Sequence, residues 1–231
     1  MLKKLGGGLL HLIYPRTCAA CGNILLNNEK VLCLSCYAEL PRTRFHNNPE
    51  NEVARLFWGR VLLRNATSFI FFNKDSNYRK ILHELKYKDQ RQVGHEMGRL
   101  FGLELRDTPF SQADMIIPVP LHPAKQRKRG YNQSELIAEG VSQVLSIPVR
   151  NNLISRKMKT ATQTRKNRFD RWLNVKDTFQ VQDIAALNDN HILLVDDVIT
   201  TGATIEACAG SILANCQVSL SVISLAYTKL Q

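Results

Sequence analysis

The sequence lacks any apolar run approaching the roughly 18 residues needed to cross a membrane. It also lacks internal repeats and low-complexity segments. Residues 1–14 imitate a signal peptide, with two lysines and a short apolar stretch, but no small-x-small cleavage site follows and Cys18 comes almost at once. We therefore interpret this segment as a short amphipathic cap. We expect a cytoplasmic protein with no transmembrane segment.

Acidic residues are nearly absent from two segments of a chain whose net charge is +11. Residues 121–131 carry four cations and no acid, and residues 156–171 carry seven cations and one acid, so the two segments account for +4 and +6. Such concentrated charge favours a polyanionic ligand, and both pyrophosphate and nucleic acid qualify. The alternative is a pair of ordinary solvated loops. Aromatic side chains that could stack on bases are scarce there, Tyr131 being the main one.

Four cysteines near the N-terminus form two Cys-x-x-Cys pairs separated by eleven residues. At this spacing four thiolates can surround Zn²⁺ tetrahedrally, and a four-cysteine site is closed, so the metal would stabilise rather than catalyse. Disulfides and redox thiols are the alternatives, but a secretion signal is lacking and a redox pair needs no second copy. The predicted zinc ligands are Cys18, Cys21, Cys33 and Cys36.

The rest of the sequence alternates strand-like and helix-like segments, which predicts an α/β layer with a mainly parallel sheet flanked by helices. With 231 residues, there is room for a small module in 1–45 and one larger domain in 46–231. Phe57 and Trp58 are expected to be packing residues rather than a binding stack. Ligands bind such sheets at the carboxyl ends of the strands. Three expected loops fall at these ends, namely 119–131, 155–171 and 196–204.

One stretch combines an apolar strand, two adjacent acids and a small hydroxyl-rich turn before a helix. The strand covers 191–195 and ends at Asp196 and Asp197, which suit sugar hydroxyls or a divalent cation because two carboxylates would repel a phosphate. The turn, at a helix N-terminus, suits a phosphate. A ribose 5-phosphate would suit the acid pair through its hydroxyls and the turn through its phosphate. The alternative is that Asp-Asp and Thr-Gly are simply ordinary turn-forming residues after a core strand. The turn comprises Thr200, Thr201, Gly202, Ala203 and Thr204.

The stretch Val195–Gly202 resembles the phosphoribosyl pyrophosphate (PRPP) signature of type I phosphoribosyltransferases. Over roughly residues 12–228, the chain resembles the ComF family (ComFC/GntX-like) of phosphoribosyltransferase-like proteins. The segments that carry this resemblance are the two cysteine pairs, His83–Tyr87, Pro118–Pro123, Arg129–Ser134, Thr160–Gln163 with Arg168, Asn174–Val175, and the acidic stretch.

The resemblance implies a type I phosphoribosyltransferase-like fold in 46–231 behind a zinc-ribbon-like module in 1–45. It implies that Asp196 and Asp197 take ribose hydroxyls, that Thr200 to Thr204 hold the 5-phosphate, and that Mg²⁺ accompanies PRPP. Arg127 and Arg129 would neutralise pyrophosphate. Arg165 and Arg168, in a loop that closes over the reacting centre, would stabilise pyrophosphate as it departs.

Two functions remain open on this resemblance. The first is transfer of ribose 5-phosphate from PRPP to a nitrogenous acceptor. The alternative is a non-enzymatic protein that handles single-stranded DNA during natural transformation, together with the DNA-uptake machinery. A PRPP-sensing regulator is a third. The sequence supplies no identifiable acceptor pocket, so it supports the donor side of a transferase better than the acceptor side.

Overall fold

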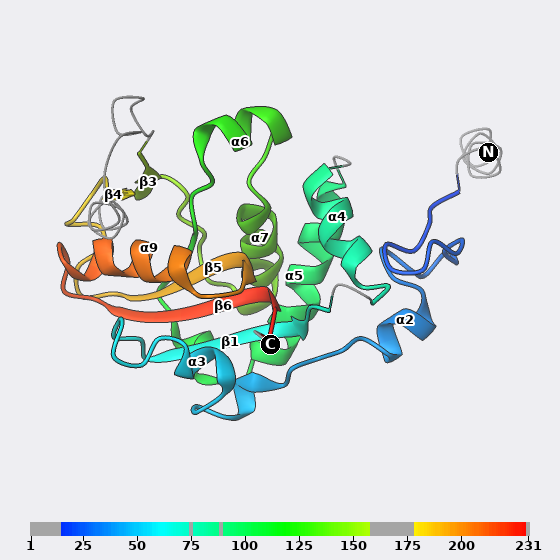
Figure 1. Cartoon of the computed structure of the whole chain (residues 1–231), viewed down its shortest axis with the longest axis horizontal. Helices are drawn as coiled ribbons and strands as arrows, with labels where there is room; N and C mark the ends of the chain where they lie inside the picture. Colours follow the sequence, from blue (N-terminus) through cyan, green and yellow to red (C-terminus); the bar gives the residue numbers. More distant parts are fainter. Residues whose placement is uncertain (1–14, 74–75, 88–89, 158–177, 230–231) are drawn as a thin grey trace.

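The fold is built on a parallel sheet, seen in a computed structural model that describes residues 15–73, 76–87, 90–157 and 178–229. Its strands lie in the order β1-β6-β5-β2 and all neighbouring pairs are parallel, which confirms the predicted sheet. An antiparallel pair, β3-β4, forms a second small sheet (Figure 1). The strands are β1 (Asn65–Phe71), β2 (Met115–Pro118), β3 (Ile154–Arg156), β4 (Phe179–Val181), β5 (His191–Ile199) and β6 (Ser219–Tyr227).

Helices cover both faces of the sheet, which explains why its strands are buried along most of their length. In β5, Leu193 and Val195 join the core under α4, α5 and α7, whereas Ile192 and Leu194 join the core under α3 and α9. No helix among the described residues is long and apolar enough to span a membrane. The helices are α2 (Leu34–Ala38), η1 (Phe45–Asn47), α3 (Glu52–Arg55), α4 (Arg79–Tyr87), α5 (Arg91–Leu105), η2 (Pro109–Gln112), α6 (Pro123–Arg129), α7 (Gln133–Leu145) and α9 (Ala203–Leu213).

Helices α5 and α7 cross with their backbones nearly in contact. A Cβ atom built on Gly140 would lie 2.0 Å from the carbonyl oxygen of His95, and one on Gly98 would lie 2.2 Å from that of Ile137. These distances exclude any side chain, so both positions require glycine. The close crossing fixes the start of α7 relative to the sheet.

Two expected boundaries near the strand ends are wrong. β5 does not end at Val195, because the backbone pairing with β6 continues through Asp196 opposite Ser224 and on to Ile199. The expected loop 119–131 contains the helix α6. Three features of the sequence explain this helix: Pro123 opens its first turn, the side chain of His122 accepts the Ala124 N–H at 3.2 Å, and Gly130 ends it at φ 79°.

Phe57 and Trp58 do not share the packing role expected of them. Phe57 is buried, at 1% exposure, in the core under α9. Trp58 is 59% exposed, because the chain turns at Gly59, with φ 72°, and carries the indole outwards. The expectation is therefore wrong for Trp58.

The N-terminal module packs against the larger domain beside α4 and α5 (Figure 1). Its buried Ala20 and Val31 belong to the same apolar core as the inner faces of those helices, and Lys30 forms a 3.1 Å ion pair with Glu96 of α5. From Pro41 the chain already runs along β1, since the Phe71 N–H donates to the Pro41 carbonyl at 2.8 Å. The division at 45/46 stays a prediction.

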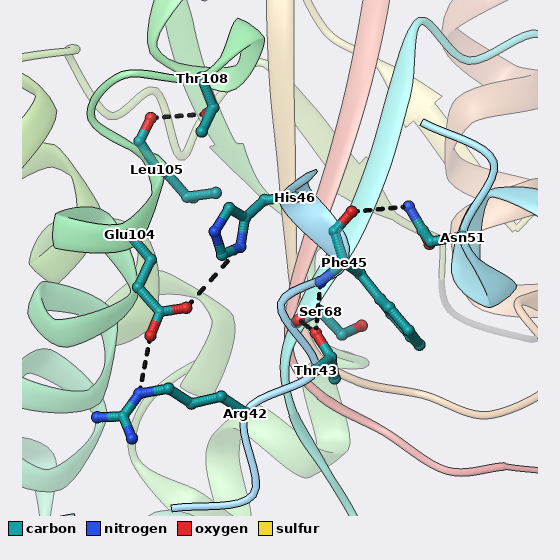
Figure 2. A network of polar contacts seen from close by, with 9 residues as sticks. All are labelled: Arg42, Thr43, Phe45, His46, Asn51, Ser68, Glu104, Leu105 and Thr108. Carbon is teal, nitrogen blue, oxygen red and sulfur yellow. Dashed lines mark hydrogen bonds and ion pairs between the residues drawn. The ribbon is translucent and has the colours of Figure 1, made fainter. Parts of the chain in front are cut away.

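A partly buried polar network fixes the segment that joins the module to the sheet (Figure 2). Arg42 Nε donates to Glu104 Oε1 at 2.8 Å, and His46 Nδ1 lies 3.8 Å from Glu104 Oε2. Burial lowers the pKa of His46, although the Glu104 carboxylate opposes this effect. Thr43 Oγ donates to the Ser68 carbonyl in β1. The joining segment is therefore held by both α5 and the edge of the sheet.

Candidate functional site

The four N-terminal cysteines form a cluster suited to zinc, as predicted. Their Sγ atoms all lie within 4.8 Å of one another. Cys21 Sγ and Cys33 Sγ are 3.8 Å apart, the edge length of a tetrahedron with Zn–S bonds of about 2.3 Å. The Cys33 N–H points at Cys18 Sγ, 3.3 Å away, which favours a thiolate. Gly22, at φ 84°, makes the turn after the first pair. The residues therefore fit a closed structural zinc site.

The cysteines respond differently to their surroundings. Burial acts to raise the pKa of the Cys18 thiol, but backbone N–H groups of Cys21, Cys33 and Ala20 outweigh it and bring the pKa down to about 7. In α9, burial raises the pKa of Cys208 far above its usual range. Cys216 is also buried, and burial raises its pKa as well. These two are packing thiols.

Asp196 and Asp197 have different environments at the carboxyl end of β5. Asp196 is buried, and its Oδ1 accepts hydrogen bonds from Ser134 Oγ at 3.2 Å and from the Asp197 N–H at 2.9 Å. Asp197 is half-buried, and its Oδ2 lies 3.2 Å from Lys86 Nζ of α4. The acid pair is thus bracketed by the end of α4 and the start of α7.

Burial is the main influence on Asp196. It raises the pKa of the carboxyl group, the neighbouring Asp197 charge raises it further, and the two hydrogen bonds only partly offset them, leaving a pKa of about 7. At neutral pH the group is therefore close to half ionised. A cation or a hydroxyl donor placed beside it would stabilise the ionised form.

The turn after β5 forms the start of α9, with Gly202 as the N-cap of the helix. Gly202 adopts φ 77°, and a Cβ atom there would lie 2.8 Å from Phe57 Cε1, so only glycine fits. Thr200, Thr201 and Ala203 are exposed, and the first N–H groups of α9 have no partners within the helix. The helix dipole adds partial positive charge at this end.

Arg60, in the loop before β1, holds this turn in place. Its Nη1 donates to the carbonyls of Thr201 and Leu56, both at 2.9 Å, and its guanidinium forms an ion pair with Glu206 in the first turn of α9. No local sequence pattern predicts this contact, because 141 residues separate Arg60 from Thr201. Lys86 was also missed as a partner of the acid pair.

The basic helix α6 lies at the same edge of the sheet. It follows β2, which runs parallel to β5, and the Val119 N–H donates to the Val195 carbonyl at 2.8 Å. Arg127 is exposed, whereas Arg129 is half-buried and donates to Gln133 Oε1 at 2.7 Å. The structure therefore brings these arginines to the edge that carries the acid pair. The predicted Arg165 and Arg168 lie outside the described residues.

Comparison with known proteins finds relatives of this chain. A family model described as a double zinc ribbon domain matches residues 9–46. Competence protein F of Haemophilus influenzae is 35% identical over 135 residues, covering 54% of this chain and 57% of that protein. ComFC of Bacillus subtilis is 25% identical over 238 residues, covering 92% and 93%. The chain is similar to proteins of the ComF family.

Another relative is the DNA utilization protein YhgH of Escherichia coli K12, 30% identical over 152 residues and covering 64% of this chain and 66% of that protein. The chain thus spans less than two thirds of the length of the Haemophilus and Escherichia relatives that it matches.

Solved structures similar to the chain include phosphoribosyltransferases. A purine phosphoribosyltransferase from Pyrococcus horikoshii has a TM-score of 0.39 at 18% identity and covers 60% of this chain and 78% of its own. Glutamine PRPP amidotransferase from Bacillus subtilis has a TM-score of 0.40 at 16% identity and covers 60% and 30%. Such low scores carry no functional argument.

Proposed function

We propose that this protein handles single-stranded DNA and that α6 is its main contact with the DNA backbone. The observation that carries the proposal is the set of exposed, unpaired cations on this helix. Lys125, Arg127 and Lys128 are exposed, and none has an acidic partner among the residues that the structure describes. Unpaired cations on one short helix offer their full charge to phosphates.

The names of the relatives support this proposal. One is a competence protein F, one is ComFC, a competence protein, and another is a DNA utilization protein. Handling DNA requires no turnover, which agrees with the lack of an identifiable acceptor pocket. We place the protein in the cytoplasm, because four zinc-binding thiolates persist most readily in a reducing compartment.

The test is the salt dependence of oligothymidylate binding, measured by fluorescence anisotropy. Neutralising Arg127 and Lys128 to glutamine should weaken binding and reduce the slope of log K against log salt by about 1.4, since each lost phosphate contact on a single strand removes about 0.7. The matched control neutralises Arg106 and Arg150, exposed cations elsewhere on the domain, and should leave the slope unchanged. Absence of binding at low salt, or equal slopes for both variants, would overturn the proposal.

We propose PRPP binding with Mg²⁺ as a second function of the carboxyl edge. The specific observation is the buried Asp196 beside Asp197: its pKa is raised to about 7, so a cation or a sugar hydroxyl placed there would stabilise the ionised form. Asp196 and Asp197 would face the ribose hydroxyls or the metal, the turn from Thr200 to Thr204 would hold the 5-phosphate, and Arg127 with Arg129 would face the pyrophosphate. Mg²⁺ would supply charge neutralisation there.

Millimolar PRPP with Mg²⁺ should raise the melting temperature of the wild type, and Asp196→Asn with Asp197→Asn should abolish that shift. Glu139→Gln, an exposed acid on α7, serves as the control and should keep it. No shift in the wild type would rule out PRPP binding. Whether ribose 5-phosphate reaches a nitrogenous acceptor, with help from Arg165 and Arg168, is tested by pyrophosphate release in a screen of acceptors.

A further inference from the structure

A hollow of about 560 Å³ lies beside the loop that joins α3 to β1. Trp58, 59% exposed, and Leu62, 83% exposed, belong to its lining. Arg60 and Arg64 line it too, and none of the described lining residues is acidic. The hollow therefore combines apolar surface with positive charge, at a place to which neither proposed function assigns a role.

Trp58 is already part of a cation–π stack. The guanidinium Cζ of Arg55 lies 5.6 Å from the centroid of the indole ring. Exposing so large an apolar ring to water is unfavourable unless something covers it. Aromatic rings and arginine planes are the surfaces on which single-stranded nucleic acids stack their bases, and every base has a face that fits them.

The loop that carries Trp58 is anchored on both sides. Phe57 is buried directly against Gly202. Arg60 donates to the carbonyls of Leu56 and Thr201, so its side chain ties the loop to the turn before α9. A stacking surface held in place loses little conformational entropy when a ligand binds.

The charge around Trp58 favours a phosphate-bearing ligand over an apolar peptide. Glu52 is the only acid between Asn51 and Ala66, against Arg55, Arg60 and Arg64. Arg55 is paired with Glu50 and Arg60 with Glu206. The guanidinium of Arg64, in contrast, donates only to the neutral Gln112, at 3.2 Å, and has no acidic partner among the described residues. One guanidinium beside the hollow is therefore available to a phosphate.

We propose that this hollow is a base-stacking subsite for single-stranded DNA, in which one unpaired base stacks on Trp58 and an adjacent phosphate faces Arg64. The proposal rests on the single-strand binding proposed above and adds the aromatic surface that α6 does not provide. Duplex DNA does not fit this role, because its bases are paired and stacked on one another.

The test uses the protein's own tryptophan emission. The chain has two tryptophans, so Trp172→Phe leaves Trp58 as the only reporter. Oligothymidylate should quench this emission at saturation, because a stacked base contacts the indole. An abasic oligomer of the same length and charge should bind through its phosphates without quenching.

Substitution gives the second measurement. Trp58→Ala should weaken oligothymidylate binding on the order of 5- to 100-fold, while its affinity for the abasic oligomer stays unchanged. Trp58→Phe should restore most of the loss, since a smaller ring still stacks. Leu62→Ala, at another exposed apolar side chain of the same hollow, is the matched control and should bind like the wild type.

The outcomes separate this inference from the proposed function. If the wild type binds neither oligomer, the DNA-handling function fails and this subsite with it. If it binds oligothymidylate without quenching of Trp58 emission, or if Trp58→Ala binds both oligomers as the wild type does, the subsite alone is refuted. The quenching experiment keeps Trp58 intact, so it stands even if Trp58→Ala does not fold.

Discussion

Asp196→Asn should stabilise the protein in a way that depends strongly on pH. Folding raises the pKa of this buried carboxyl from 3.8 to about 7. Below pH 4 the group is protonated in both the folded and the unfolded state, so it costs nothing. As the pH rises towards 7, the unfolded chain ionises the group freely while the folded protein resists, and stability is lost at about 1.4 kcal/mol per pH unit.

The total loss above pH 7 is on the order of 4 kcal/mol, since the pKa rises by about three units. Asparagine does not titrate, and its side-chain oxygen can accept the same hydrogen bonds from Ser134 and from the backbone of residue 197. The variant should therefore match the wild type near pH 4. Its advantage in the free energy of unfolding should grow to roughly that value by pH 8.

Urea denaturation of both proteins between pH 4 and pH 8.5, at constant zinc, measures this difference. Glu139→Gln is the control, because it removes an exposed acid from α7, the helix that carries Ser134, and should give no pH-dependent gain. Parallel pH profiles for the wild type and Asp196→Asn would refute the reasoning. They would mean that the carboxyl keeps its ordinary pKa despite its burial.

Three further predictions concern the glycines and the zinc site. Gly140→Ala should lower the free energy of unfolding, measured by urea denaturation, by about 1–3 kcal/mol, because its methyl group would overlap the His95 carbonyl. Gly210→Ala, in open space on α9, is the control and should raise that free energy by up to about 1 kcal/mol. Equal effects of the two substitutions would argue against the close helix crossing. Cys36→Ser should lose stoichiometric zinc in metal analysis, and full retention would contradict the four-thiolate site. Gly202→Ala should lower the melting temperature, because its φ of 77° disfavours alanine; an unchanged value would mean that the turn relaxes.

The sequence was sufficient where local rules decide the structure. The spacing of the cysteines predicted their cluster, and the apolar run before Asp196 predicted a strand with both faces buried. The start of α7 follows a local rule as well, since the Asn132 side chain accepts the Ser134 N–H at 3.2 Å and caps the helix. In each case the residues that determine the structure lie within a few positions of one another, or, as with the cysteines, form two copies of one short motif.

The sequence was misleading where burial depends on distant parts of the chain. Two adjacent aspartates looked like the end of a strand, because charged residues are rarely buried without partners. Asp196 is nevertheless buried, since the start of α7 covers it and Ser134 bonds to it. Lys86 and Arg60 reach the site from segments more than 100 residues away, and no local pattern marks such contacts. In contrast, the signals for α6 were present at Pro123 and Gly130.

The two proposed functions place opposite demands on the same edge of the sheet. A DNA backbone guided by α6 would be repelled by two free carboxylates, whereas a ribose with Mg²⁺ needs them. The structure reduces the conflict, because Lys86 neutralises Asp197 and burial keeps Asp196 close to half protonated at neutral pH. With no cation bound, the edge therefore carries little negative charge. A divalent cation would draw the proton from Asp196 and compete with Lys86, so PRPP and DNA should respond to magnesium in opposite directions.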